Sequence, residues 1–144
     1  MTQTNWLRVR PEAHVESRST WTIAINENQY LLGATVILLN RPCEAVADLT
    51  AAEWMDLHAQ LRRVQRALDD LLRPDQYDHA FLTSRSHQVY LDVVPRYRGS
   101  RSWAGELFQD PHFGDVFRVE DRRLSGPALQ DLRDAVRARL PAVV

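Results

Sequence analysis

The chain has 144 residues, 44% hydrophobic and 26% charged, which fits one globular domain whose core needs no metal or disulfide. Its 18 basic and 19 acidic side chains give a net charge of -1, which excludes the basic field of non-specific nucleic-acid or membrane binders. The single Cys43 cannot form an internal disulfide, and no apolar run approaches the roughly 18 residues of a membrane span. We therefore expect a cytoplasmic protein without metal, cofactor, nucleic-acid or membrane partner.

The first third of the chain predicts the beginning of a sheet. Residues 1–18 have no clear period and are interpreted as a loosely structured lead-in that could include a short strand or turn, and residues 19–144 are interpreted as a single domain. Two apolar, β-branched runs follow, Trp21–Ile25 and Thr35–Leu39, and we expect them to form antiparallel strands joined by a turn. The second run is apolar on both faces, which is typical of a central strand covered by a helix.

A long helix is predicted to begin after Thr50. Thr50 and Glu53 have the spacing of a capping box, in which each side chain accepts a hydrogen bond from the backbone N–H of the other. Apolar residues then recur at helical spacing until Pro74 ends the pattern. The members of this stripe are Trp54, Leu57, Leu61, Val64, Leu68 and Leu71 or Leu72.

The second half of the chain predicts two further strands, Tyr77–Thr83 and Gln88–Val94, separated by a tight connection at Ser84–Ser86. Alternation along the later strand places Gln88, Tyr90 and Asp92 on one face. This face is therefore polar, whereas the opposite face is apolar.

The remaining residues predict an irregular tail and a closing helix. A segment rich in Gly, Ser and aromatic residues runs to Gly114, and a short strand is expected at Val116–Val119. The closing helix is expected at Ser125–Leu140, because Ser125 and Pro127 suit its cap and first turn.

The strand that ends on Pro95 and Arg96 resembles the signature strand of the histidine triad superfamily, which reads His-x-His-x-His-x-x-Pro-Arg. With Pro95 and Arg96 matched to its end, Gln88, Tyr90 and Asp92 stand in the places of the three histidines. Three further segments are similar to the family: a glycine-led strand at 33–39, a helix opening at 48–54 and a tail at 103–114. The resemblance runs from about residue 19 to 99, and more weakly to 114.

The resemblance implies an α+β fold, in which one long helix and a C-terminal helix accompany an antiparallel sheet of about five strands. It also implies a homodimer and a nucleoside or nucleotide ligand. Family members of this branch hydrolyse phosphoric anhydrides or phosphoramides, so the same chemistry would be expected of an active member. Asn26 stands where the family has an Asn or Asp that binds a ribose hydroxyl, although it could also cap a turn.

Three departures from the family affect its chemistry. Tyr90 replaces the middle histidine, the family's nucleophile, and a phenol with a pKa of about 10 is a weak nucleophile unless a base activates it. The phosphate-holding loop is shortened to residues 82–87 and lacks glycine. Asp92 adds a negative charge beside the place of a phosphate.

Three interpretations remain open. In the first, the chain is a degenerate member that binds a nucleoside or nucleotide between Asn26, Tyr90 and the strand of Ile23 and Ile25. In the second, it is a hydrolase or nucleotidyl transferase that uses Tyr90 as nucleophile and Asp92 as base, with Gln88 beside them and His112 folding back from the tail. In the third, it is a structural subunit without a ligand.

One further group of residues could hold a ligand. Arg85, with Ser84 and Ser86 on either side, has the composition of a small anion site, although an exposed Arg in a polar turn is commonly only solvated.

Overall fold

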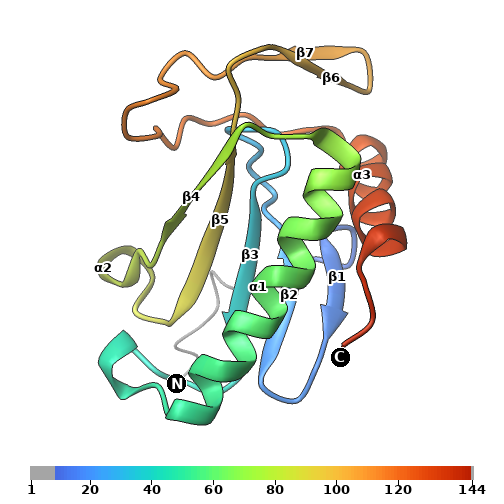
Figure 1. Cartoon of the computed structure of the whole chain (residues 1–144). Coiled ribbons are helices and arrows are strands. Elements are labelled where there is room, and N and C mark those ends of the chain that lie inside the picture. Colours follow the sequence, from blue (N-terminus) through green and yellow to red (C-terminus); the bar gives the residue numbers. More distant parts are fainter. Residues whose placement is uncertain (1–8, 144) are drawn as a thin grey trace.

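The computed structural model describes residues 9–143, in which five strands form one antiparallel sheet in the order β1-β2-β3-β5-β4 (Figure 1). These strands are β1 (His14–Ser17), β2 (Trp21–Ile25), β3 (Thr35–Leu39), β4 (Gln76–Ala80) and β5 (Tyr90–Arg96). The other elements are a 3₁₀ turn η2 (Val46–Asp48), the helices α1 (Ala51–Leu72), α2 (Thr83–Ser86) and α3 (Gly126–Arg139), and a hairpin of β6 (Arg101–Trp103) and β7 (Glu106–Phe108). The predicted α+β arrangement of five strands, one long helix and a C-terminal helix is confirmed.

The helix α1 crosses one face of the sheet, and α3 packs beside it next to β1 (Figure 1). The capping box forms as predicted: Thr50 Oγ1 accepts from the Glu53 N–H at 3.1 Å, and Glu53 Oε1 accepts from the Thr50 N–H at 2.8 Å. The helix ends where Arg73 adopts a left-handed conformation before Pro74. Trp54 differs from its expected place on the apolar stripe, since it is 43% exposed and contacts the edge of the Phe81 ring.

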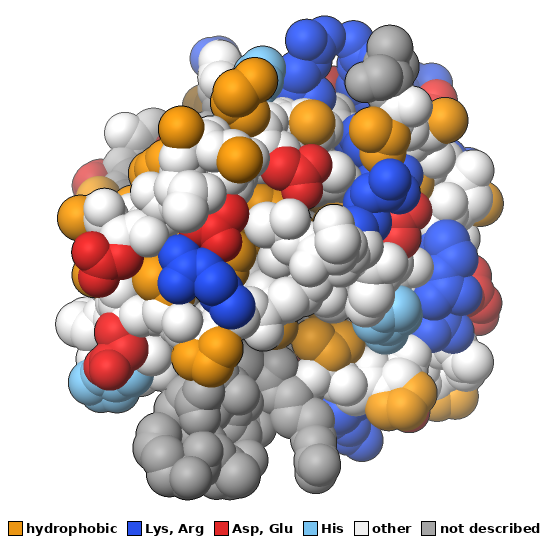
Figure 2. Space-filling view, turned by 90° about the horizontal axis from the view of Figure 1, so that it is seen from below, with side chains coloured by type: hydrophobic (Ala, Val, Ile, Leu, Met, Phe, Trp, Pro, Cys, Tyr) orange, Lys and Arg blue, Asp and Glu red, His pale blue; other side chains and the backbone are white. Residues whose placement is uncertain are grey.

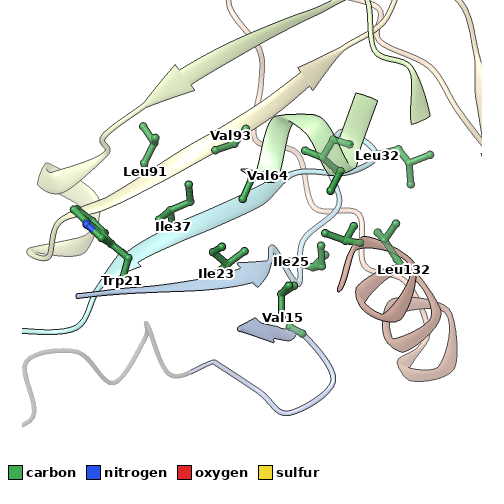
Figure 3. Packing of buried hydrophobic residues seen from close by; sticks show 14 of the residues in the cluster. Val15, Trp21, Ile23, Ile25, Leu32, Ile37, Val64, Leu91, Val93 and Leu132 are labelled. Carbon is green, nitrogen blue, oxygen red and sulfur yellow. The ribbon is translucent and has the colours of Figure 1, made fainter. Parts of the chain in front are cut away.

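The core lies between the helices and one face of the sheet (Figure 3). The large side chains of β2, including Trp21, Ile23 and Ile25, point toward this layer, together with Ile37 and Leu91 from the next strands. Complete burial of such a side chain contributes about 1.5–3 kcal/mol. The opposite face of the sheet is therefore left to the smaller and polar residues that alternate with them.

The first strand lies inside the segment that the sequence assigns to the lead-in. His14–Ser17 pairs with β2, and Val15 is buried in the core. The pattern is hard to read in the sequence because this strand has four residues and Val15 is its one aliphatic side chain. The sheet therefore begins within residues 1–18, although residues 1–8 lie outside the described part of the chain.

The tail differs from the prediction. Val116–Val119 forms no strand, and Val116 is exposed, so the expectation of a strand there is wrong. Two strands form earlier instead, as the hairpin of β6 and β7, whose turn consists of Ala104 and Gly105. Both turn residues have a positive φ, as a two-residue hairpin of the right twist requires. Three residues on each side of the turn are too few to give a readable alternation.

The segment before β5 also differs in detail. The tight connection at Ser84–Ser86 is part of one helical turn, α2, and the signature strand begins at Tyr90 rather than at Gln88. Within residues 9–143, no helix has the length and apolar composition that a bilayer-spanning segment needs.

Candidate functional site

A cavity of about 320 Å³ opens on the face of the sheet that α1 does not cover. Its floor is a row of paired residues, since Ala24 of β2 lies opposite Val36 of β3, and Val36 lies opposite Asp92 of β5. We call it the Asp92 cavity. Its lining consists of Val9, Ala13, Ala24, Ile25, Asn26, Glu27, Asn28, Tyr30, Val36, Leu82, Arg85, Tyr90, Asp92, Val119 and Arg123.

Asp92 is a buried carboxyl with apolar neighbours in the sheet. Asp92 pairs with Val36 of β3 on one side and with Ala80 of β4 on the other, so its side chain lies between theirs. The residue is 3% exposed. Burial raises the pKa of Asp92 to about 7, against the opposing effect of the positive charge of Arg85. No hydrogen bond to this carboxyl is formed from residues 9–143. Near neutral pH the group is thus divided between its acid and carboxylate forms.

Tyr90 lies two residues before Asp92 and lines the same cavity. Burial, with a further contribution from the charge of Asp92, raises the pKa of Tyr90 to about 12. Burial likewise raises the pKa of Tyr30, whose ring stacks on Phe117 at 5.9 Å between centroids. Both phenols are therefore protonated at neutral pH, and a phenolate nucleophile is disfavoured at Tyr90.

Gln88 belongs to the protein interior rather than to the cavity lining. Its Oε1 accepts from the Cys43 N–H at 3.0 Å, and its Nε2 donates to the carbonyls of Leu39 and Arg41 at 3.1 and 2.8 Å. The residue is 1% exposed. Gln88 therefore connects the segment before β5 to the segment that follows β3, and its role in the protein is structural.

The residues proposed for the ligand pocket divide between the two faces of the sheet. Ile23 points into the core because β2 turns its largest side chains toward the helices, and Ile25 is a core residue that also borders the cavity. Ala24, which the sequence interpretation missed, occupies the floor. Its signal was the alternation of β2, in which Ala24 and Asn26 share a face.

Asn26 lines the cavity and also caps the turn that follows β2. Its Oδ1 accepts from the Asn28 N–H at 3.0 Å. Of the two roles that the sequence left open for Asn26, the cap of the turn is formed, and the same side chain lies in the wall of the cavity.

Of the three residues predicted to form an anion site on α2, one reaches the cavity. Arg85 lines it, whereas Ser84 and Ser86 are outside the lining. Ser86 is buried, and its Oγ donates to the Gln88 carbonyl at 2.6 Å. The one-turn helix directs successive side chains to different sides, which separates Arg85 from the two serines.

Charges at the rim of the cavity are largely paired. Glu27 accepts from Arg10 at 3.3 Å, and Arg123 lies 3.1 Å from Asp121. Beyond the cavity, basic side chains are interspersed with acidic ones over the face that Figure 2 shows. Among the described residues, no group of three or more His, Cys, Asp and Glu side chains is arranged to hold a metal ion.

The tail is fixed by a second buried cluster, which is centred on Arg96. Arg96 donates to both carboxylate oxygens of Asp110, to Asp78, and to the carbonyls of His112 and Asp115. The side chain of His112 borders a different cavity, next to Tyr30. His112 therefore lies outside the lining of the Asp92 cavity, because Arg96 holds its backbone at the far end of β5.

No protein-family model matches the sequence, and no curated protein sequence matches it. Solved structures do resemble the chain. A histidine triad protein of Bradyrhizobium japonicum is 17% identical with a TM-score of 0.68, and the match covers 88% of this chain and 89% of that one. A hypothetical histidine triad nucleotide-binding protein of Sulfolobus tokodaii is 11% identical with a TM-score of 0.68 over 89% and 83% of the two chains.

A third similar structure is the diadenosine triphosphate hydrolase of Plasmodium falciparum, solved in complex with cyclomarin A. It is 11% identical with a TM-score of 0.63, and the match covers 90% of this chain and 77% of the hydrolase. At such identities the shared feature is the path of the backbone. The chain therefore has the fold of the histidine triad superfamily.

Proposed function

We propose that this chain binds a nucleoside or nucleotide in the Asp92 cavity and does not perform histidine-triad catalysis. The observation that carries this proposal is the position of Asp92, a buried carboxyl without a protein hydrogen-bond partner among the described residues, on the floor of that cavity. A buried polar group of this kind is stabilised by a ligand that completes its hydrogen bonds.

The composition of the lining supports a small organic ligand. The volume of about 320 Å³ lies at the lower end of the range of small-molecule sites. Aliphatic side chains such as Ala24, Val36 and Leu82 and the rings of two tyrosines share the lining with six polar or charged residues, which suits a ligand with both an apolar and a polar part. The fold neighbours include one structure described as a nucleotide-binding protein and one as a diadenosine triphosphate hydrolase, which favours a nucleoside or its phosphate.

A second candidate is a hydrolase or nucleotidyl transferase with a non-histidine site. The observation that favours it is the raised pKa of Asp92, about 7, because a general base is most effective when its pKa lies near the working pH. The pKa of Tyr90, about 12, counts against the same candidate, since its hydroxyl would have to lose a proton to attack phosphorus. Binding without catalysis therefore ranks first.

Titration calorimetry tests the proposal with adenosine, guanosine, their monophosphates and a dinucleoside polyphosphate. Heat of binding for at least one of them is expected. If none binds, the proposal fails and a structural role without a ligand replaces it.

Hydrolysis of a fluorogenic nucleoside phosphoramidate tests the second candidate. Wild type and Tyr90→Phe are compared at equal concentration, and we expect no turnover in either protein. Turnover in wild type that Tyr90→Phe abolishes would instead establish Tyr90 as a catalytic residue.

We also propose a homodimer and a cytoplasmic location. The dimer is supported by β4, which forms one edge of the sheet and leaves backbone groups available for pairing. The location is supported by the one cysteine, Cys43, which is buried and unpaired and suits a reducing compartment. Analytical ultracentrifugation tests the first proposal, and a mass near 16.6 kDa would contradict it.

A further inference from the structure

We propose that the Asp92 cavity selects an uncharged nucleoside over its phosphorylated form, with a hydroxyl or amino group of the ligand donating a hydrogen bond to the Asp92 carboxylate. This inference rests on the proposed function and reverses the preference for phosphate that the fold would suggest. Asp92, Arg85 and the paired rim charges carry the argument.

The first step is that the Asp92 carboxyl is accessible from the cavity. Among the described residues, no fully buried side-chain nitrogen or oxygen lacks a hydrogen-bond partner. The Asp92 carboxyl makes no such bond, so the small exposure of its oxygens must open into the cavity that it lines. The carboxyl is therefore a ready acceptor for a ligand that brings its own donor.

The second step is that the protein supplies little positive charge to hold a phosphate here. Of the two cationic side chains in the lining, Arg123 is paired with Asp121, which leaves Arg85 on an exposed helical turn. The acidic groups of the lining are Asp92 and Glu27, and Glu27 is paired with Arg10. A phosphate in this space would face a buried carboxylate with one solvated guanidinium to offset it.

The third step concerns size. The cavity of about 320 Å³ can take one base and one ribose, with little space left for further groups. Its apolar wall suits a base, and the donors of a ribose or base suit Asp92. In a dinucleoside polyphosphate, the phosphates and the second nucleoside would extend into solvent, where they make no contact that contributes to binding.

The fourth step is a dependence on pH with opposite signs for the two ligands. The titratable and charged groups that share the cavity with Asp92 are Tyr90 on its own strand, Arg85 from α2, and Tyr30, Glu27 and Arg123. Because the pKa of Asp92 is about 7, the carboxylate becomes the main form above that pH. A neutral donor then binds more strongly as pH rises, whereas a phosphate is repelled more strongly.

Calorimetry with adenosine and adenosine monophosphate at pH 6 and pH 8 tests the inference. Adenosine is expected to bind more tightly than the monophosphate, by about tenfold at pH 8 and by less at pH 6. The phosphate itself titrates near pH 6, so the variant Asp92→Asn separates the two effects. In this variant the preference for adenosine should fall to near unity at pH 8.

The variant Asp131→Asn is the matched control, because Asp131 lies on the exposed side of α3 and its loss changes the net charge equally. It should keep the preference of the wild type. Equal or tighter binding of the monophosphate to the wild type at pH 8 would overturn the inference and leave the proposed function intact. If neither compound binds, the comparison is repeated with guanosine and its monophosphate, and absence of binding by all of these and by a dinucleoside polyphosphate would refute the proposed function itself. Circular dichroism verifies the folding of each variant.

Discussion

Arg96 and Asp110 form a two-pronged ion pair that is shielded from solvent. Arg96 Nε donates to Asp110 Oδ2 at 2.7 Å and Arg96 Nη2 donates to Oδ1 at 3.1 Å, and the two side chains are 3% and 1% exposed. Burial raises the pKa of Asp110, but hydrogen bonds from Arg96 and from the Tyr97 N–H more than offset this effect and lower it. The Pro-Arg end of the signature strand therefore fixes the tail that runs past the cavity.

Breaking this pair should destabilise the protein strongly. Asp110→Asn removes the shielded carboxylate that holds two nitrogens of the guanidinium and leaves Arg96 with the half-exposed carboxylate of Asp78, and breaking a buried pair costs about 3–5 kcal/mol. Urea denaturation should show this decrease in the free energy of unfolding at pH 7. The exposed pair of Arg123 and Asp121 provides the control, since Asp121→Asn should change the free energy of unfolding by less than about 1 kcal/mol. Similar effects of both variants would contradict a structural role for the buried pair.

Ionisation of Asp92 should make the free energy of unfolding of the wild type depend on pH. The pKa of Asp92 is raised from 3.8 to about 7, so between these pH values the folded protein keeps a proton that the unfolded chain releases. The contribution of Asp92 to stability therefore falls as pH rises through this window and is constant above about pH 7.

Asp92→Asn tests this expectation, because the amide is neutral at every pH and occupies nearly the same volume. Relative to wild type, the variant should gain on the order of 2–4 kcal/mol in the free energy of unfolding at pH 8, and much less at pH 4. Urea denaturation at both values measures the difference, with Asp131→Asn as the charge control. An effect of Asp92→Asn that is the same at both pH values would refute the raised pKa.

The centre of the fold was predictable from the sequence because its signals are local. The capping box and the 22 residues of α1 form one continuous periodic pattern, and β3 is a compact apolar run. The strand β1 could not be placed within the lead-in because it contains one aliphatic residue, and its position depends on pairing with β2. Pairing is a tertiary interaction that local periodicity does not encode.

The site was predictable in part for a similar reason. Tyr90 and Asp92 share a face by alternation, and the structure brings both to the cavity. Ile23 lies outside the cavity because the largest side chains of β2 point toward α1, which leaves Ala24 for the cavity floor. The raised pKa of Asp92 depends on Val36 and Ala80, which are brought beside it by strand register.

Gly33 should tolerate no side chain. It has a φ of +90°, and a Cβ at this position would lie 2.7 Å from Leu72 Cδ1 and 3.2 Å from Pro95 Cγ. Gly33→Ala should therefore lower the free energy of unfolding by about 1–3 kcal/mol, as measured by urea denaturation. Gly114 also has a φ of +90° but has open space around it, so Gly114→Ala measures the backbone strain alone. If the two variants lose equal stability, contact with Leu72 and Pro95 has no effect.

Gln88 should be required for stability rather than for ligand binding. Gln88→Leu leaves the Cys43 N–H and the carbonyls of Leu39 and Arg41 without their partner, and a buried unpaired group costs about 1–3 kcal/mol. The free energy of unfolding should decrease accordingly, whereas the dissociation constant for the best nucleoside should stay within about twofold of wild type. A large loss of affinity in folded protein would place Gln88 in the binding site after all.

Filling the cavity from its floor should abolish ligand binding while the fold persists. Ala24 points into the Asp92 cavity between Val36 and the turn at Asn26, so Ala24→Phe would place an aromatic ring in the volume that a nucleoside needs. Calorimetry with adenosine should show at least a tenfold loss of affinity, which corresponds to about 1.4 kcal/mol. The control Ala59→Phe adds the same ring at a half-buried position of α1 that lies next to His58 and Arg62 and outside the lining of the Asp92 cavity, where it should leave adenosine binding unchanged. If Ala24→Phe is folded by circular dichroism and still binds adenosine as wild type does, the ligand site lies elsewhere, because a ring on the floor and a base against it cannot share a space of about 320 Å³.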